Sequence, residues 1–374
     1  MPKRMVLQQY FGYDDFRPGQ EPLIDGILAG RDVLGIMPTG GGKSMCYQIP
    51  ALLLPGLTLV VSPLISLMKD QVAALNGAGI PAALLNSSLD EASYRETCWQ
   101  LRQGMHKLLY VAPERLENEG FLRLMQEQEI SMIAVDEAHC VSQWGQDFRP
   151  SYLKIPDFVA QLPHRPVVSA FTATATAEVQ ADIVQRLELI DPVKIVTGFD
   201  RPNLYFEVRR PTQKLPLLTQ LVEDRAGRSG IIYCATRANV EKVCDHLRQR
   251  GIPATRYHAG LSEAERRQNQ DDFQFDRAPV MVATNAFGMG IDKSNVSYVF
   301  HFNMPKSLEA YYQEAGRAGR DGEAAECILL FAQGDVATAE FFIHQSGDNN
   351  EALTPEELEE IQARDYQRLE AMVG

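Results

Sequence analysis

The chain of 374 residues lacks any apolar run that approaches the roughly 20 residues required to span a bilayer. Its first residues also lack the apolar stretch of a secretory signal peptide. These two absences lead us to expect a cytoplasmic protein with no membrane partner.

Cysteine is scarce, and its spacing excludes two further classes of protein. The six cysteines are scattered through the chain without a C-x-x-C pair, at positions 46, 98, 140, 234, 244 and 327. Neither a disulfide framework nor a zinc site built on paired cysteines fits this spacing. We therefore expect six reduced thiols.

A basic excess is missing as well, although nucleic-acid-binding domains commonly carry one. The formal net charge is −13 at pH 7. Residues 335–374 hold ten acidic side chains against two arginines, a net charge of −8, which leaves −5 for the first 334 residues. A mildly acidic body can still carry a local basic track, so net charge alone does not exclude nucleic acid as a partner.

Three consecutive glycines stand in the segment MPTGGGKS at 37–44, between a short apolar run and a segment with helical spacing of apolar residues. Glycine backbone folds tightly and aims successive N–H groups at phosphate oxygens, and the following helix adds its positive N-terminus. Lys43 supplies a cation for the outer phosphates, and Ser44 supplies a hydroxyl for magnesium. The general pattern of such loops has Gly where this chain has Met37. Because the Gly-Lys-Ser end is intact, we predict a nucleoside triphosphate site.

Two adjacent carboxylates, Asp136 and Glu137, follow the apolar run 130–135. Parallel strands present ligand-binding residues at their carboxyl ends, which is where these side chains emerge. Neighbouring carboxylates repel one another unless a cation lies close. We predict that Asp136 and Ser44 hold Mg²⁺ and that Glu137 positions and deprotonates the attacking water. The nearby His139 is expected to connect the site to other motifs rather than to bind metal.

Apolar runs of strand length alternate with helical segments, which predicts an α/β fold whose sheets are mostly parallel with helices on both faces. We expect domains at 1–200 and 201–345, linked near 197–203, and an acidic helical tail at 346–374. The strands are expected near 33–37, 57–62, 81–85, 107–111, 131–136 and 166–171, and then near 204–208, 229–233, 254–257, 279–283, 296–301 and 326–331.

A second glycine-containing segment, GRAGR at 316–320, follows the helical run 308–315. Arginine is always charged, and its planar donors suit phosphate oxygens. Charge builds on the transferring phosphoryl group in the transition state, so arginines supplied by a second domain stabilise it. No phosphate loop recurs in the second half of the chain. We therefore expect one domain to bind the nucleotide and the other to close on it.

These motifs, in this order, resemble those of superfamily 2 helicases, and specifically the RecQ family of 3′-to-5′ DNA helicases. The matching segments are FGY at 11–13, FRPGQ at 16–20, the phosphate loop, VSPLISLMKDQ at 61–71, APER at 112–115, DEAH at 136–139, FTATA at 171–175, YHAGL at 257–261, AFGMGIDK at 286–293 and QEAGRAGRDG at 313–322. The stretch most particular to the family is CVSQWGQDFRP at 140–150, directly after the carboxylates.

The resemblance implies two tandem RecA-like domains that use ATP and Mg²⁺, in DNA repair and recombination. It implies single-stranded DNA and 3′-tailed duplex DNA as partners. It also implies a monomer of the bacterial cytoplasm, associated with the nucleoid, that meets other DNA repair proteins. Relatives commonly continue into a zinc-binding module and a winged helix, and residues 335–374 match neither. We therefore interpret the sequence as a catalytic core, either cut from a longer protein or naturally short.

The resemblance also assigns roles to individual residues. Gln20 would read adenine through its amide, with Tyr13 and Arg17 stacked on the ring, although core packing explains Tyr13 equally well. The catalytic set is Lys43, Asp136, Glu137, Arg317 and Arg320. The nucleotide-binding set is Tyr13, Arg17, Gln20, Thr39, Gly40, Gly41, Gly42, Lys43, Ser44, Met45, Gly290 and Asp292. Many relatives have Asn where this chain has Asp292, which puts a role for that single residue in doubt.

A third set of side chains is expected to contact nucleic acid. Its members are Ser62, Lys69, Arg115, Trp144, Phe148, Arg149, Thr174 and Arg237. Aromatic and Arg side chains stack on unpaired bases, each contributing about 1–3 kcal/mol. In the family, the loop that holds Trp144 senses DNA and gates hydrolysis. A Trp in a loop also commonly anchors that loop, so both interpretations of Trp144 stay open.

Two rival functions remain beside a DNA helicase that couples ATP hydrolysis to translocation and unwinding. The first is a DNA-stimulated ATPase or translocase core that unwinds little by itself, because the duplex-holding domains of its relatives are missing. The second is an RNA helicase of the same superfamily. Strand displacement on a 3′-tailed DNA duplex and on a matched RNA duplex separates all three.

Overall fold

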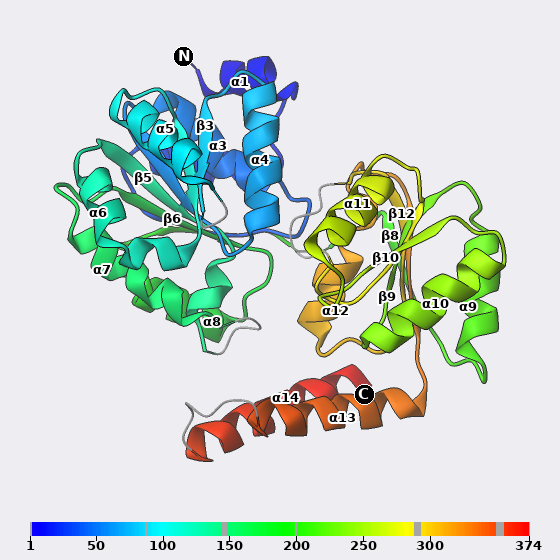
Figure 1. The fold of residues 1–374 in the computed structure, drawn as a ribbon. Coiled ribbons are helices and arrows are strands. Elements are labelled where there is room, and N and C mark those ends of the chain that lie inside the picture. The colour runs from blue at the N-terminus through cyan, green and yellow to red at the C-terminus, as the bar shows by residue number, and fades with distance from the viewer. Residues whose placement is uncertain are drawn as a thin grey trace. The chain divides into compact units, whose positions relative to one another are not determined.

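The computed structural model describes residues 2–86, 89–143, 148–198, 200–287, 293–348 and 355–373. The chain divides into two compact units, Met1–Phe199 and Asp200–Gly374, each with its own sheet (Figure 1). Among the described residues, no helix combines the length and the hydropathy that crossing a bilayer requires.

Unit 1 contains a seven-stranded sheet in which the recorded strand pairs are all parallel. Its strands are β1 (Val33–Ile36), β2 (Leu57–Val61), β3 (Ala82–Leu85), β4 (Leu108–Val111), β5 (Ile130–Val135), β6 (Val167–Thr172) and β7 (Val193–Val196). Their order across the sheet is β3-β4-β2-β5-β6-β1-β7. The consecutive strands β1 and β2 are therefore separated by β6 and β5, and the loops after these four strands meet at one edge, where parallel α/β sheets bind ligands.

Helices cover both faces of this sheet because its strands are apolar on both sides. In β1, Val33 belongs to one core, whereas Leu34 and Ile36 belong to the other. On the Val33 face lie α2 (Gln20–Leu28), α3 (Lys43–Leu53) and α4 (Ile65–Gly77). On the other face lie α5 (Glu91–Arg102), α6 (Glu119–Gln126), α7 (Ile155–Ala160) and α8 (Ala177–Arg186). Short helical segments complete unit 1: α1 (Lys3–Val6), η1 (Leu7–Phe11), η2 (Pro113–Glu117), η3 (Ala138–Val141) and η4 (Pro150–Lys154).

Unit 2 repeats the plan with a six-stranded sheet, again parallel at the recorded pairs. The strands are β8 (Leu204–Arg209), β9 (Ser229–Tyr233), β10 (Ala254–Tyr257), β11 (Val280–Ala283), β12 (Val296–His301) and β13 (Ala325–Leu330), in the order β10-β11-β9-β12-β13-β8. Helices α9 (Lys214–Glu223) and α10 (Arg237–Gln249) pack in one core. Helices α11 (Glu263–Gln274) and α12 (Leu308–Ala315) pack in the other.

Two further helices, α13 (Gln333–Asp348) and α14 (Pro355–Val373), lie side by side at the end of the chain (Figure 1). A small apolar cluster joins Ile343 of α13 and Leu369 of α14 to Met304, which precedes α12. Helix α13 runs across residue 345, where the sequence placed the end of the second domain.

The predicted fold class is confirmed, because each unit holds a parallel sheet between two layers of helices. Twelve of the strands lie within a residue or two of their predicted positions, and β7 was missed. Residues 193–196 are a four-residue edge strand whose side chains alternate between partly buried and exposed. Such a short alternation carries little signal in a sequence.

Candidate active site

The loops after β1, β2, β5 and β6 bring the predicted catalytic residues of unit 1 to one edge of its sheet. The phosphate loop follows Ile36, Ser62 follows Val61, and Asp136 follows Val135. The Asp136 N–H donates to the Val61 carbonyl at 2.9 Å, which continues the β2–β5 pairing by one residue. Segments distant in the sequence thus converge because their strands are neighbours.

The phosphate loop requires its glycines. Gly40 and Gly42 both have φ of +79°, in the left-handed region that side chains disfavour. A Cβ on Gly42 would lie 2.3 Å from Gln20 Nε2, and a Cβ on Gly41 would lie 2.9 Å from the Pro38 carbonyl oxygen. The loop is therefore a tight cradle that a larger residue would fill or distort.

Met37, which replaces a glycine of the general pattern, lies inside the core rather than in the cradle. Its side chain is buried, and its N–H donates to the Thr172 carbonyl at 3.0 Å. Its own carbonyl accepts from Lys43 Nζ at 3.2 Å. The departure from the pattern leaves the Gly-Lys-Ser end unchanged, as the sequence indicated.

Lys43 is the first residue of the eleven-residue helix α3, so the Lys-Ser pair stands at the helix end that favours anions. Lys43 and Ser44 are half-buried, as are their neighbours in the nucleotide-binding set, Thr39 and Met45. The cradle, the helix N-terminus and the lysine together suit a polyphosphate.

Two of the three residues expected to bind adenine, Gln20 and Arg17, contact the cradle, and the three differ in exposure. The Gln20 side chain is buried; its Oε1 accepts from the Arg17 N–H at 2.8 Å and its Nε2 donates to the Gly42 carbonyl at 3.0 Å. One lone pair and one hydrogen of this amide remain available, which matches one edge of adenine. Arg17 is exposed and donates to the Gly40 carbonyl, and Tyr13 is 49% exposed. Core packing of Tyr13 is therefore excluded.

Asp136 and Glu137 form a crowded pair of acids. Asp136 is 8% exposed, and its Oδ2 accepts from the Ser62 hydroxyl at 3.3 Å. Burial, reinforced by the negative charge of Glu137, raises the Asp136 pKa to about 7, although the charge of Lys43 opposes this shift. Glu137 has φ of +48°, a strained value for a residue with a side chain. Its Oε2 is buried and has no hydrogen-bond partner among the described residues.

His139 links this pair to the end of β6. Its Nδ1 lies 2.8 Å from the Thr172 hydroxyl and 3.4 Å from Glu137 Oε2. The Thr172 hydroxyl in turn donates to the Thr174 carbonyl at 3.2 Å. This chain of contacts agrees with the expectation that His139 connects motifs. Within the described residues, no cluster of three or more His, Cys, Asp or Glu side chains suits a metal ion.

The residues expected to contact nucleic acid are dispersed over unit 1 and α10 of unit 2. Lys69 on α4 and Arg237 at the start of α10 are exposed. Arg115, Phe148, Arg149 and Thr174 are half-buried, and Ser62 is buried against Asp136. Trp144 lies outside the described residues, as do Gly290 and Asp292 of the nucleotide-binding set. The roles of these side chains in binding nucleic acid stay a prediction.

Unit 2 holds Arg317 and Arg320 on the turn that follows α12. Arg317 is 7% exposed, and Arg320 is half-buried. The Arg201 guanidinium donates to the carbonyls of Ala318 at 3.0 Å and Gly319 at 2.8 Å. Asn203 Nδ2 donates to the same Gly319 carbonyl at 2.9 Å. This structural role of Arg201 and Asn203 was not predicted, and their place within the predicted linker 197–203 was the available signal.

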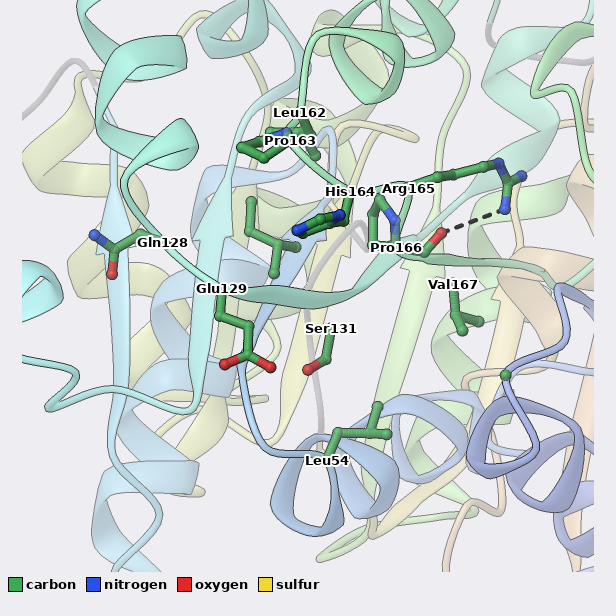
Figure 2. A pocket seen from close by; sticks show the side chains of 12 residues that line it. Leu54, Gln128, Glu129, Ser131, Leu162, Pro163, His164, Arg165, Pro166 and Val167 are labelled. Carbon is green, nitrogen blue, oxygen red and sulfur yellow. Dashed lines mark hydrogen bonds between the residues drawn. The ribbon is translucent and has the colours of Figure 1, made fainter.

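A cavity of about 480 Å³ lies at the opposite, amino-terminal edge of the unit 1 sheet (Figure 2). Glu129, Ser131 and His164 line it, together with Arg165. The Arg165 guanidinium is committed to the buried carboxylate of Asp32 at 2.7 Å. No predicted site residue lines this cavity, so the candidate active site remains at the carboxyl edge.

Two family models match the chain. The "DEAD/DEAH box helicase" model matches residues 17–183, and the "Helicase conserved C-terminal domain" model matches residues 213–322. The two matches fall in unit 1 and unit 2 respectively.

Curated relatives are similar over nearly the whole chain. The ATP-dependent DNA helicase RecQ of Bacillus subtilis is 47% identical over 98% of this chain and 61% of its own length. A probable ATP-dependent DNA helicase of the same organism, RecS, is 40% identical over 98% of this chain and 74% of its own length. Saccharomyces cerevisiae Dbp5 bound to RNA and ADP BeF3 shares the fold, with a TM-score of 0.71, 18% identity, and coverage of 99% of this chain and 97% of that one. The chain spans little more than half the length of several RecQ relatives.

The raised pKa of Asp136 predicts a pH-dependent stability. In the folded, metal-free protein this carboxyl keeps its proton up to about pH 7, whereas in the unfolded chain it loses the proton near its ordinary pKa of 3.8. Its stabilising contribution is therefore complete below pH 3.8 and is lost as pH rises through 7. Asp136→Asn, which cannot ionise, should melt progressively higher than wild type between pH 5 and pH 8 in EDTA, by about 2–4 °C for each 1 kcal/mol.

A melting difference at Asp136 that is constant or shrinks from pH 5 to pH 8 would contradict the raised pKa.

Proposed function

Because the chain belongs to the RecQ family of DNA helicases, we propose that it is the motor core of an ATP-dependent 3′-to-5′ DNA helicase. The observation that carries the proposal is the meeting of the phosphate cradle and the acidic pair at one edge of the unit 1 sheet. The motor would couple ATP hydrolysis to translocation on single-stranded DNA and to duplex unwinding, in repair and recombination.

Nucleotide binding is assigned to the cradle and its neighbours. The glycine backbone of residues 40–42 lines the phosphate site, and the Gly41 N–H closes the loop by donating to the Pro38 carbonyl at 2.8 Å. Lys43, at the start of α3, neutralises the outer charge of the phosphates. Gln20 reads adenine with the donor and acceptor that its contacts to Arg17 and Gly42 leave available.

The acidic pair suits a divalent cation. Burial, reinforced by the charge of Glu137, raises the pKa of Asp136 to about 7, and a positive charge beside the two carboxylates would favour their ionised forms. Asp136 and Ser44 would hold Mg²⁺, which supplies charge neutralisation on the β- and γ-phosphates. Asp136 must release its proton to serve as a ligand, and the neighbouring Lys43 favours that ionised form.

Glu137 is assigned as the group that orients and deprotonates the attacking water. Its Oε2 accepts no hydrogen bond from the described residues, although His139 Nδ1 lies 3.4 Å away, and 17% of the Glu137 side chain is exposed. Arg317 and Arg320 are assigned to the charge that develops on the transferring phosphoryl group. Arg201 and Asn203 would fix the backbone from which these arginines extend.

The experiment that tests the proposal is strand displacement on three substrates of equal length: a 3′-tailed DNA duplex, a 5′-tailed DNA duplex and a 3′-tailed RNA duplex. ATP-dependent displacement of the 3′-tailed DNA alone is the expected result. ATP hydrolysis without displacement would instead support the translocase core, and displacement of the RNA duplex would support an RNA helicase.

Glu137→Gln should lose hydrolysis while retaining nucleotide binding. The amide cannot take a proton from water, so kcat should fall by about 100-fold or more. The phosphate cradle is unchanged, so the Kd for Mg²⁺–ATP should stay within about twofold of wild type. Lys43→Ala, which removes the cation for the outer phosphates, should weaken binding as well as turnover. A Glu137→Gln protein whose loss lies entirely in nucleotide affinity would show that Glu137 is structural.

Gln20→Ala should raise the KM for ATP more than the KM for GTP. The reason is that the Gln20 amide favours adenine over guanine, and a bidentate contact of this kind contributes about 1–3 kcal/mol to the preference. Steady-state KM values for both nucleotides check this. If both KM values rise by the same factor, Gln20 only supports Gly42 and adenine is read elsewhere.

A further inference from the structure

We propose that Tyr152 is a positioning residue for the acidic pair: its hydroxyl holds the peptide between Asp136 and Glu137 in the orientation that places the Glu137 carboxylate at the site. The hydroxyl donates to the Asp136 carbonyl oxygen at 2.9 Å. The inference deepens the proposed function and rests on it, because it takes Glu137 as the group that activates water.

The strain at Glu137 makes this hydrogen bond consequential. Glu137 has φ of 48° and ψ of 46°, a left-handed conformation that costs a non-glycine residue about 1–3 kcal/mol and persists only where its surroundings impose it. Rotation of the 136–137 peptide changes ψ of Asp136 and φ of Glu137 together. A donor fixed on the carbonyl of that peptide therefore acts directly on the strained torsion.

Tyr152 is well placed to act as a fixed donor. Its side chain is fully buried in η4, in the same core as Ala138 and Val141, the first and last residues of η3.

Segments 61–63, 136–140 and 149–152 are joined by further hydrogen bonds. We call these three segments the carboxylate clasp. The Asp136 N–H donates to Val61, and the Arg149 N–H donates to the Cys140 carbonyl, both at 2.9 Å. The Arg149 guanidinium donates to the Pro63 carbonyl at 3.3 Å. Within the clasp, the Tyr152 hydroxyl is the recorded side-chain donor to the 136–137 peptide. Its loss should therefore release that peptide without dismantling the clasp.

The test is Tyr152→Phe, which removes only the hydroxyl. Turnover should be measured at saturating Mg²⁺–ATP and saturating single-stranded DNA, at a temperature well below each melting point. We expect kcat to fall by about tenfold or more, since a misplacement of about 1 Å costs about 100-fold in rate. The KM for ATP and the Kd for single-stranded DNA should both stay within about twofold of wild type.

Tyr298→Phe is the matched control. The Tyr298 side chain is also fully buried, but its hydroxyl has no hydrogen-bond partner among the described residues. Its kcat should stay within about twofold of wild type. A Tyr152→Phe protein that melts lower but keeps its kcat would overturn the proposal in favour of simple packing. A raised KM with unchanged kcat would overturn it in favour of nucleotide binding.

A rescue variant keeps the proposal testable if Tyr152→Phe does not fold. Replacing Tyr152 by 4-aminophenylalanine restores an N–H donor at the same place on the ring, and we expect it to retain kcat within about threefold. A folded rescue variant with a tenfold loss of kcat would contradict the proposal. A wild-type protein without ATPase activity would instead defeat the proposed function, so the two failures are distinguishable.

Discussion

The turn at the end of β5 is the constraint on which the candidate site depends. It places Asp136 beside the Ser62 hydroxyl and holds Glu137 in a left-handed conformation. Burial and the neighbouring charge of Glu137 destabilise the ionised form of Asp136 and raise its pKa to about 7. Such a site is suited to a cation, which would reduce the repulsion between the two carboxylates, and to a water molecule, which would hydrogen-bond to them.

Much of this arrangement was predictable from the sequence. Runs of Val, Ile and Leu bounded by glycine or polar residues predicted the strands of both sheets. Parallel strands that are buried on both faces have nearly continuous apolar sequences. The phosphate loop and the acidic pair were predictable because each depends on local backbone chemistry that short motifs encode. The short edge strand β7 was not predictable, because Val193–Val196 forms a strand through its pairing with β1 and has no distinctive sequence pattern.

Other parts of the site depend on contacts that no local pattern encodes. Tyr152 reaches the Asp136 carbonyl across 16 residues, and Arg201 reaches the turn at Gly319 across 118 residues. A buried tyrosine or a linker arginine looks unremarkable in sequence, and its importance comes from the partner that the tertiary fold supplies. Exposure likewise decided between two interpretations of Tyr13, whose side chain is 49% exposed and therefore does not pack in a core.

We propose that the carboxyl edge of the unit 1 sheet is an ATP-hydrolysing site that responds to nucleic acid. The most direct measurement of this claim is the steady-state rate of ATP hydrolysis by the wild-type chain with Mg²⁺, with and without single-stranded DNA. The account predicts Mg²⁺-dependent hydrolysis that single-stranded DNA accelerates. No hydrolysis under either condition, or a rate that single-stranded DNA leaves unchanged, would contradict it.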